Sequence, residues 1–198
     1  MWRHVTFGAT LLLVACQSSQ ESQSKVPVPD SSAYPTRASY LEEWRQIADS
    51  LTVERQRVIL QNLLSAAERE GWAGAVRYCH AAAETLTFYK GEKIYFQRVA
   101  LRNRNPKNAL ADSLDEAAYK RFAETKSKES FIVEVGNGTL RYYRPIYIPM
   151  VQCLKCHGKP QDLDGPALAE IRKRYPKDKA VDFAQGDLRG MWKAEIRP

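Results

Sequence analysis

Apolar residues along positions 40–64 recur at spacings of three, four and seven, which is the pattern of one buried face of an α-helix. A second helical pattern follows Gly71 and runs from about residue 72 to residue 89, with apolar positions four and three residues apart in turn. We therefore predict two successive helices in the first third of the folded part. Their apolar faces consist of Tyr40, Trp44, Ile47, Leu51, Val58, Ile59, Leu63 and Leu64, and of Trp72, Val76, Cys79, Ala83 and Leu86.

Strand patterns follow these helices. Residues 93–101 are rich in β-branched and aromatic side chains, which favours a strand. Residues 131–135 and 139–148 have the same character and flank an Asn-Gly turn at Asn137, which is typical of a β-hairpin. A last strand is predicted near residues 188–196. Helices that precede an antiparallel sheet indicate the α+β fold class.

The first 15 residues have the pattern of a secretory signal peptide. Arg3 is followed by an apolar run that is too short to span a bilayer, which takes about 20 residues. The run ends in Leu13-Val14-Ala15-Cys16, which resembles a bacterial lipobox and implies cleavage before Cys16 and lipid attachment to it. An ordinary signal peptide that ends in a cysteine is the alternative. We therefore expect export and lipid anchoring at the periplasmic face of a bacterial membrane.

Residues 16–36 are predicted to be a lipidated tether. Between residues 17 and 36 there are six serines, three glutamines and three prolines, and this composition buries too little apolar surface to offset the entropy of ordering. Residues 37–198 then have the size of one domain. Because 44% of the chain is hydrophobic, that domain has enough apolar material for a core.

The formal net charge is +7, and loss of Arg3 with the signal peptide leaves +6. Basic residues are interleaved with acidic ones, for example along residues 124–129. Binding to nucleic acid would call for a concentrated basic stripe, and an exported protein has no access to it. We therefore expect no nucleic-acid partner. The basic balance favours anionic lipid headgroups or an acidic protein partner.

The most informative motif is Cys153-Leu154-Lys155-Cys156-His157, a C-x-x-C-H sequence of the kind that attaches a c-type haem. Two thiols at this spacing can add to the two vinyl groups of a porphyrin, and the histidine that follows can ligate the iron. This attachment takes place outside the cytoplasm, which agrees with the predicted export. The motif therefore predicts one covalently attached haem c.

Two other interpretations of the motif are weaker. A structural zinc site would need further ligands, usually a second C-x-x-C or a pair of histidines, and the sequence contains neither. A thioredoxin-like redox pair would need a surrounding βαβ pattern, which is missing although an apolar run at residues 146–151 precedes the motif. The residues therefore favour haem over both alternatives.

The second axial ligand of the iron has few candidates. Once the signal peptide is removed, His80 is the only histidine besides the one in the motif, and Met150 and Met191 are the only methionines. Met150 is poorly placed because it lies three residues before the motif. Cys79 is the one cysteine without an assigned role.

Helix geometry separates Cys79 from His80, because neighbouring residues differ by about 100° around the helix axis. Cys79 lies on the apolar face of the second predicted helix, and His80 falls to its flank. An inert buried thiol is the alternative role for Cys79. From the residues alone, the sixth ligand stays open between Cys79, His80, a methionine and an open position.

Several segments between about residues 75 and 190 resemble, in the same order, the PAS-like c-type haem domain family, formerly a domain of unknown function. They are Ala75-Val76-Arg77-Tyr78-Cys79, Arg102-Asn103-Arg104-Asn105-Pro106-Lys107-Asn108, Cys153-Leu154-Lys155-Cys156-His157-Gly158, Tyr175-Pro176-Lys177-Asp178-Lys179-Ala180 and Gly186-Asp187-Leu188-Arg189-Gly190. The Arg-Asn-Pro segment is the most telling of them, because C-x-x-C-H occurs in many families. The resemblance implies a PAS-like antiparallel sheet of four or five strands flanked by N-terminal helices. It also implies haem ligated by His157 and by a cysteine thiolate from the N-terminal helical region, which is Cys79 by position.

This family occurs alone or as the exported sensor part of bacterial signalling proteins. The resemblance therefore implies a redox or small-ligand sensor for nitric oxide, carbon monoxide or oxygen, with a thiolate ligand that leaves. The sequence shows no kinase, transmembrane or methyl-accepting segment, so we expect the signal to reach a separate redox or signalling protein. The alternative is a low-potential electron-transfer cytochrome docked on a membrane partner.

We predict no enzymatic activity. A peroxidase, the minor alternative, would need an open iron with a distal acid–base residue such as His80 or Glu84. Four side chains are candidates to hold the haem propionates or to line the pocket, because arginine and tyrosine pair well with carboxylates: Arg104, Arg144, Tyr142 and Tyr143. A homodimer is a further candidate state, paired through the apolar face around Trp44, Leu51 and Val58.

Overall fold

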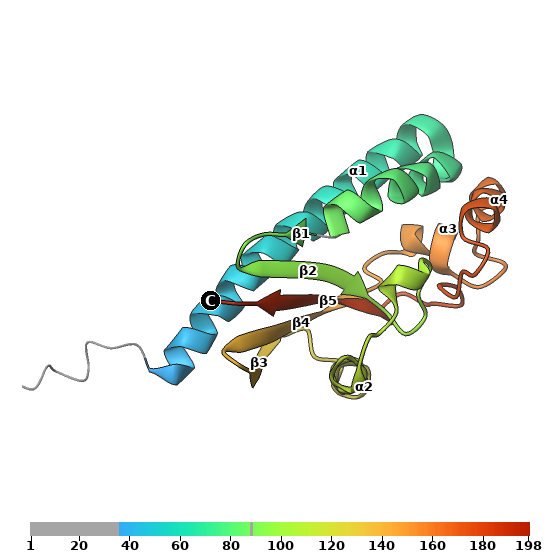
Figure 1. Cartoon of the computed structure of the whole chain (residues 1–198). Coiled ribbons are helices and arrows are strands. Elements are labelled where there is room, and N and C mark those ends of the chain that lie inside the picture. Colours follow the sequence, from blue (N-terminus) through green and yellow to red (C-terminus); the bar gives the residue numbers. More distant parts are fainter. Residues whose placement is uncertain (1–35, 88) are drawn as a thin grey trace, which may run out of the picture. The chain divides into compact units, whose positions relative to one another are not determined.

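The computed structural model describes residues 36–87 and 89–198, whose helices and strands are drawn in Figure 1. The predicted signal peptide, the lipidation site Cys16 and nearly all of the tether lie outside the described residues. The side chains of residues 83–89 also lie outside the description, and with them the predicted apolar positions Ala83 and Leu86. Among the helices that are described, none is both long and apolar enough to span a membrane.

Helix α1 (Arg37–Thr87) consists of two helical arms that meet at Gly71. Gly71 has φ 68° and ψ −178°, a conformation that is essentially restricted to glycine. The chain reverses there, so the second arm runs back beside the first (Figure 1). The two predicted helices are thus confirmed, with the break at the glycine that precedes the second apolar pattern.

The five strands form one antiparallel sheet in the order β1-β2-β5-β4-β3. The C-terminal strand β5 (Leu188–Ile196) lies in the middle, between β2 (Ile94–Val99) and β4 (Thr139–Tyr147). The predicted hairpin is present as β3 (Phe131–Gly136) and β4, and the predicted last strand coincides with β5. The short edge strand β1 (Tyr89–Lys90) begins at the residue predicted to end the second helix, which in the structure ends at Thr87.

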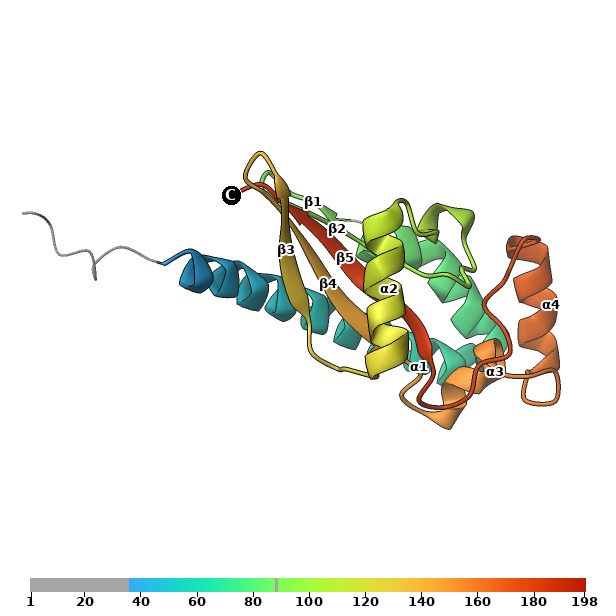
Figure 2. The same cartoon turned by 90° about the horizontal axis from the view of Figure 1, so that it is seen from below.

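Helices cover both faces of this sheet. The first arm of α1 packs on one face, where Ile59 and Trp192 are buried in the same apolar cluster. Helix α2 (Ser113–Thr125) packs on the other face, where Phe122 and Met191 are buried together (Figure 2). The predicted α+β class is confirmed. The helical cover of the second face, however, comes from α2, which the apolar pattern did not predict, and not from an N-terminal helix.

The remaining helical segments gather at one end of the sheet, beside the second arm of α1 (Figure 1). They are η2 (Pro106–Asn108), η3 (Val151–Cys153), α3 (Leu154–His157) and α4 (Gly165–Arg174). Val76 of the second arm is buried against Ala167 and Ile171 of α4. This packing attaches the returning arm of α1 to the segment that contains the C-x-x-C-H motif.

The apolar face predicted to pair two chains is divided in the structure. Trp44 packs against the core of the sheet, so it is not free for a partner. Ile47 and Leu51 are 37% and 36% exposed, respectively. The homodimer stays a prediction that these contacts neither require nor exclude.

Replacement of Gly71 by alanine is expected to destabilise the protein by about 1–3 kcal/mol, because a β-carbon makes this backbone conformation strained. Urea unfolding monitored by circular dichroism measures the change. Arg69→Ala, two residues earlier at an exposed helical position, is the matched control and should change the free energy of unfolding by less than about 0.5 kcal/mol. Equal effects of the two substitutions would contradict the role assigned to Gly71.

Candidate functional site

A cavity of about 330 Å³ lies where the end of the sheet meets both arms of α1 and the motif. Its walls include the ends of β2, β4 and β5 and the loop around residues 103–108. Much of the lining is apolar and comes from the two arms, with Leu60 and Leu63 on the first and Val76 on the second. A cavity of this size, with an apolar lining and a few converging polar groups, is typical of a binding site for a small molecule or cofactor.

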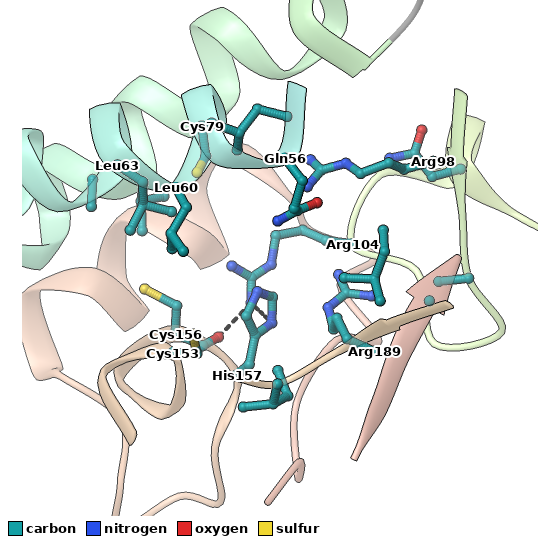
Figure 3. A pocket seen from close by; sticks show the side chains of 18 of the residues that line it. Gln56, Leu60, Leu63, Cys79, Arg98, Arg104, Cys153, Cys156, His157 and Arg189 are labelled. Carbon is teal, nitrogen blue, oxygen red and sulfur yellow. Dashed lines mark hydrogen bonds between the residues drawn. The ribbon is translucent and has the colours of Figure 1, made fainter. Parts of the chain in front are cut away.

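Three cysteines line this cavity: Cys79 from the second arm of α1, Cys153 from the end of η3 and Cys156 from α3. None of the three is in a disulfide bond. Figure 3 shows Cys79 on the α1 side and the two motif cysteines across the cavity from it. Burial raises the pKa of all three thiols, to about 11 for Cys156. The structure therefore brings together the three cysteines that the sequence singled out. Cys79 lies more than 70 residues before the two cysteines of the motif.

The half-buried side chain of His157 lines the same cavity, and its imidazole holds a defined proton. Its Nδ1 lies 2.8 Å from the carbonyl oxygen of Ala180. Because a carbonyl oxygen only accepts hydrogen bonds, this contact requires the proton on Nδ1 and leaves the lone pair on Nε2 for a metal. Burial and the nearby guanidiniums of Arg104 and Arg189 lower the pKa of His157 well below its usual value, so the ring is neutral.

Arg104 ties the motif to the loop that holds His157. Its Nη2 donates to the carbonyl oxygen of Cys156 at 2.5 Å, and its Nε donates to Oδ2 of Asp178 at 3.2 Å. Oδ1 of Asp178 accepts from the backbone N–H of Ala180 at 2.8 Å. One connected set of hydrogen bonds therefore fixes the orientation of the imidazole. Arg104 is among the residues that line the cavity, and its role toward a haem stays a prediction.

The glycine after the motif also has a structural reason. A β-carbon on Gly158 would lie 2.6 Å from Cβ of Asp162 and 2.7 Å from the carbonyl oxygen of Leu154. Only glycine therefore allows the backbone after α3 to pass this close to Leu154 and Asp162. The carbonyl oxygen of Gly158 accepts a hydrogen bond from the backbone N–H of Asp182 at 2.9 Å, which holds the later loop beside the end of the motif.

Cys79 and His80 differ in their relation to the cavity, although both contribute to its lining. The sulfur of Cys79 is directed into the cavity from the underside of the helix (Figure 3). His80 is exposed, and its ring packs edge-on against Tyr175 with a distance of 5.3 Å between centroids. The predicted division of the two neighbours into an inward and a flanking position is confirmed. Their roles as ligands stay predictions.

Neither methionine lines the cavity. Met191 is fully buried on the opposite face of the sheet, against α2, and Met150 is not among the lining residues. The side chain of Glu84, the other predicted distal acid–base candidate, lies outside the described residues. Of the side chains predicted as candidates for the sixth ligand, only Cys79 and His80 therefore line the cavity.

Three of the four residues predicted to contact propionates are elsewhere, so that prediction is wrong for Tyr142, Tyr143 and Arg144. The hydroxyl of Tyr142 and Nη1 of Arg144 both donate to Oδ1 of Asp49, at 2.6 and 2.8 Å. The hydroxyl of Tyr143 donates to Asp115 at 2.7 Å on the other face of the sheet. Because successive side chains of a strand point to opposite faces, Tyr142 and Tyr143 cannot both line one cavity.

Sequence reasoning missed two arginines that project into the cavity, Arg98 near the end of β2 and Arg189 near the start of β5 (Figure 3). Burial lowers the pKa of Arg98, and burial together with the guanidinium of Arg104 lowers that of Arg189 to about 9. Among the described residues, no carboxylate lies within 4 Å of either guanidinium. The available signal was an arginine in the middle of the β-rich run of residues 93–101, beside Val99, Ala100 and Leu101.

Two residues with amide side chains, Gln56 and Asn108, also line the cavity, and the sequence analysis assigned neither of them to the site. Oε1 of Gln56 and Oδ1 of Asn108 are buried and have no hydrogen-bond partner in the described part of the protein. Buried polar atoms of this kind normally have a partner. Their state indicates that the cavity takes a group with polar as well as apolar surface.

Comparisons with known proteins agree with this picture. A family model described as Tll0287-like matches residues 35–197. Among solved structures, the crystal structure of the cyanobacterial haem protein Tll0287 matches with a TM-score of 0.51 and 24% sequence identity, over 73% of this chain and 91% of that chain. A search of curated proteins finds no match. The likeness to the solved structure shows that the fold is shared.

Proposed function

Since the chain belongs to the Tll0287-like family, which confirms the predicted resemblance to PAS-like c-type haem domains, we propose that it binds one covalently attached haem c. One observation carries the proposal: Cys79, Cys153, Cys156 and His157 all line a single cavity. The solved relative is itself a haem protein, which supports the same assignment.

The cavity fits this cofactor chemically. Cys153 and Cys156 would hold the porphyrin through thioethers, and Nε2 of His157 would ligate the iron because Nδ1 is held by Ala180. Apolar side chains such as Leu60 and Leu63 suit the macrocycle, and the unpartnered amide oxygens could accept hydrogen bonds from bound water. When bound, haem supplies a one-electron couple and an iron position that diatomic gases can occupy.

We propose that the protein is a haem-based redox or small-ligand sensor in which Sγ of Cys79 is a ligand that leaves. Cys79 lines the cavity from α1, across from the motif, so its thiolate could serve as a second protein ligand to the iron (Figure 3). Burial disfavours the thiolate, as the raised pKa of Cys79 indicates, so a released Sγ would take up a proton and stay neutral. A stable Cys79 ligand in both oxidation states would instead suit the alternative role, a low-potential electron carrier.

Gas binding separates these two roles. We expect the ferric protein to resist nitric oxide and carbon monoxide, and the dithionite-reduced protein to bind carbon monoxide with a shift of its main absorption band. Titration of both oxidation states under anaerobic conditions, followed by absorption spectroscopy, measures this. If the ferrous form takes up no gas while it still transfers electrons to an external acceptor, the electron carrier is the better description.

We also propose that the protein is exported, lipidated at Cys16 and held at the periplasmic face of a bacterial membrane, where a separate redox or signalling protein reads its state. The support is the apolar leader that ends in Leu13-Val14-Ala15-Cys16 and the polar segment that follows it. Metabolic labelling with a radioactive fatty acid, with Cys16→Ser as control, tests the anchor.

A further inference from the structure

Arg98 and Arg189 carry two positive charges into one side of the cavity, and among the described residues neither forms an ion pair with a carboxylate within 4 Å. The contacts of Arg98 include the ring of Trp192, whose centroid lies 5.8 Å from its guanidinium carbon. Nη1 of Arg189 donates to the backbone carbonyl of Arg102 at 3.1 Å, and its guanidinium lies over the ring of Phe183. These contacts hold the two side chains in place without a salt bridge to either guanidinium, and Asp178 offsets the charge of Arg189 only in part.

Arg104 provides the comparison within the same cavity. Its guanidinium is paired with Asp178 and satisfied further by the carbonyl of Cys156. Asp178 pairs with Arg104 and acts on Arg189 only over a longer distance, and among the described residues no other carboxylate forms an ion pair with Arg98 or Arg189. A buried guanidinium without a counter-charge is costly in free energy. The lowered pKa of Arg98 and Arg189 is the expression of that cost.

We propose that Arg98 and Arg189 form the receptor for the two propionate carboxylates of the haem. The proposal rests on the proposed function, since it requires haem in this cavity. A porphyrin of this kind carries two carboxylates, so its binding would neutralise both guanidiniums. A guanidinium binds a carboxylate through two parallel hydrogen bonds, so the interaction depends on the orientation of the carboxylate as well as on its charge.

The positions of the two arginines suit this role. Arg98 and Arg189 come from the adjacent strands β2 and β5, whose pairing places Val99 opposite Met191 and so brings both side chains to the same end of the sheet. A β-carbon at Gly190 would lie 2.7 Å from the carbonyl oxygen of Val99, so glycine permits the strands to approach there. One end of two paired inner strands therefore presents both arginines, across the cavity from the thiols of the motif (Figure 3).

The first test is the reduction potential of the haem-loaded chain in Arg98→Met and Arg189→Met. A nearby positive charge favours ferrous over ferric iron, so its loss should lower the ferrous-to-ferric ratio at a fixed electrode potential. We expect at least a tenfold fall for each variant, which is about 59 mV for a one-electron couple. Arg144→Met, which removes a guanidinium paired with Asp49 outside the cavity, is the control and should leave the potential unchanged.

The second test is thermal unfolding with and without haem. In the Cys153→Ala/Cys156→Ala chain purified free of haem, Arg98→Met and Arg189→Met should raise the melting temperature by about 5 °C, because an uncompensated buried charge is removed. In the haem-loaded chain the same substitutions should lower it. Arg144→Met should lower it in both forms. A purely structural role for Arg98 and Arg189 would give a loss in both forms, and so would overturn the proposal.

Different results would contradict the proposed haem binding and the proposed propionate site. Absence of covalent haem from the wild-type chain would sink the proposed function. Covalent haem with an unchanged potential in both arginine variants would leave the haem protein intact and overturn the propionate receptor alone. If the haem-free chain does not unfold cooperatively, the potential measurement decides by itself.

Discussion

Replacement of both Cys153 and Cys156 by alanine is expected to leave the purified protein without covalently attached haem, which is a complete loss of attachment. Both thiols line the cavity within one short helical segment, so each can form a thioether to the same porphyrin. Acid–organic extraction and haem staining of a denaturing gel measure attachment. The wild type should keep its haem through denaturation, and the double variant should release it.

Single substitutions and Cys79→Ala are the controls for this prediction. Cys153→Ala alone should retain attachment through Cys156, and Cys79→Ala should retain both thioethers. Free extraction of haem from the wild-type chain would refute the haem c assignment altogether. Retention of haem in the double variant would place the covalent link at another residue.

Replacement of Cys79 by alanine is expected to keep the haem attached but to remove the thiolate signature from the ferric spectrum. The reduction potential should rise, because an anionic ligand that favours ferric iron is lost. We expect the ferrous-to-ferric ratio at fixed electrode potential to rise at least tenfold, which is about 59 mV. Absorption spectroscopy, electron paramagnetic resonance and redox titration measure these changes. The sign is opposite to that expected for Arg98→Met and Arg189→Met.

His80→Ala is the matched control, because His80 is the next residue along the helix and its side chain is exposed, whereas the sulfur of Cys79 is directed into the cavity. His80 is exposed and packs against Tyr175, so its loss should leave the low-spin ferric spectrum in place. The opposite pattern would reverse the assignment. If Cys79→Ala leaves the ferric spectrum unchanged and His80→Ala converts it to high spin, the protein is a bis-histidine electron carrier.

The periodicity of apolar residues predicted those elements whose structure depends mainly on residues close together in the sequence. The break at Gly71 could be predicted because helix periodicity is a local property, and β3, β4 and β5 because alternation and an Asn-Gly turn are local too. Helices α2 and α4 were missed although capping residues were present. The side chain of Asp112 accepts from the N–H of Asp115, and that of Asp164 accepts from the N–H of Ala167. Their short apolar stripes were too weak to stand out.

By itself, then, the sequence determined which groups are candidates to attach and ligate a haem: two thiols and an imidazole at fixed spacing, and one spare cysteine on an apolar helix face. Only the tertiary structure decided which other residues meet them. Tyr142 and Arg144 were assigned to the pocket from residue type, yet they bind Asp49. Arg98 and Arg189 were overlooked, yet they line the cavity because β2 pairs with β5 in one register. Such pairings join residues about 90 positions apart, and their register follows from the packing of the whole sheet, which no short window of sequence encodes.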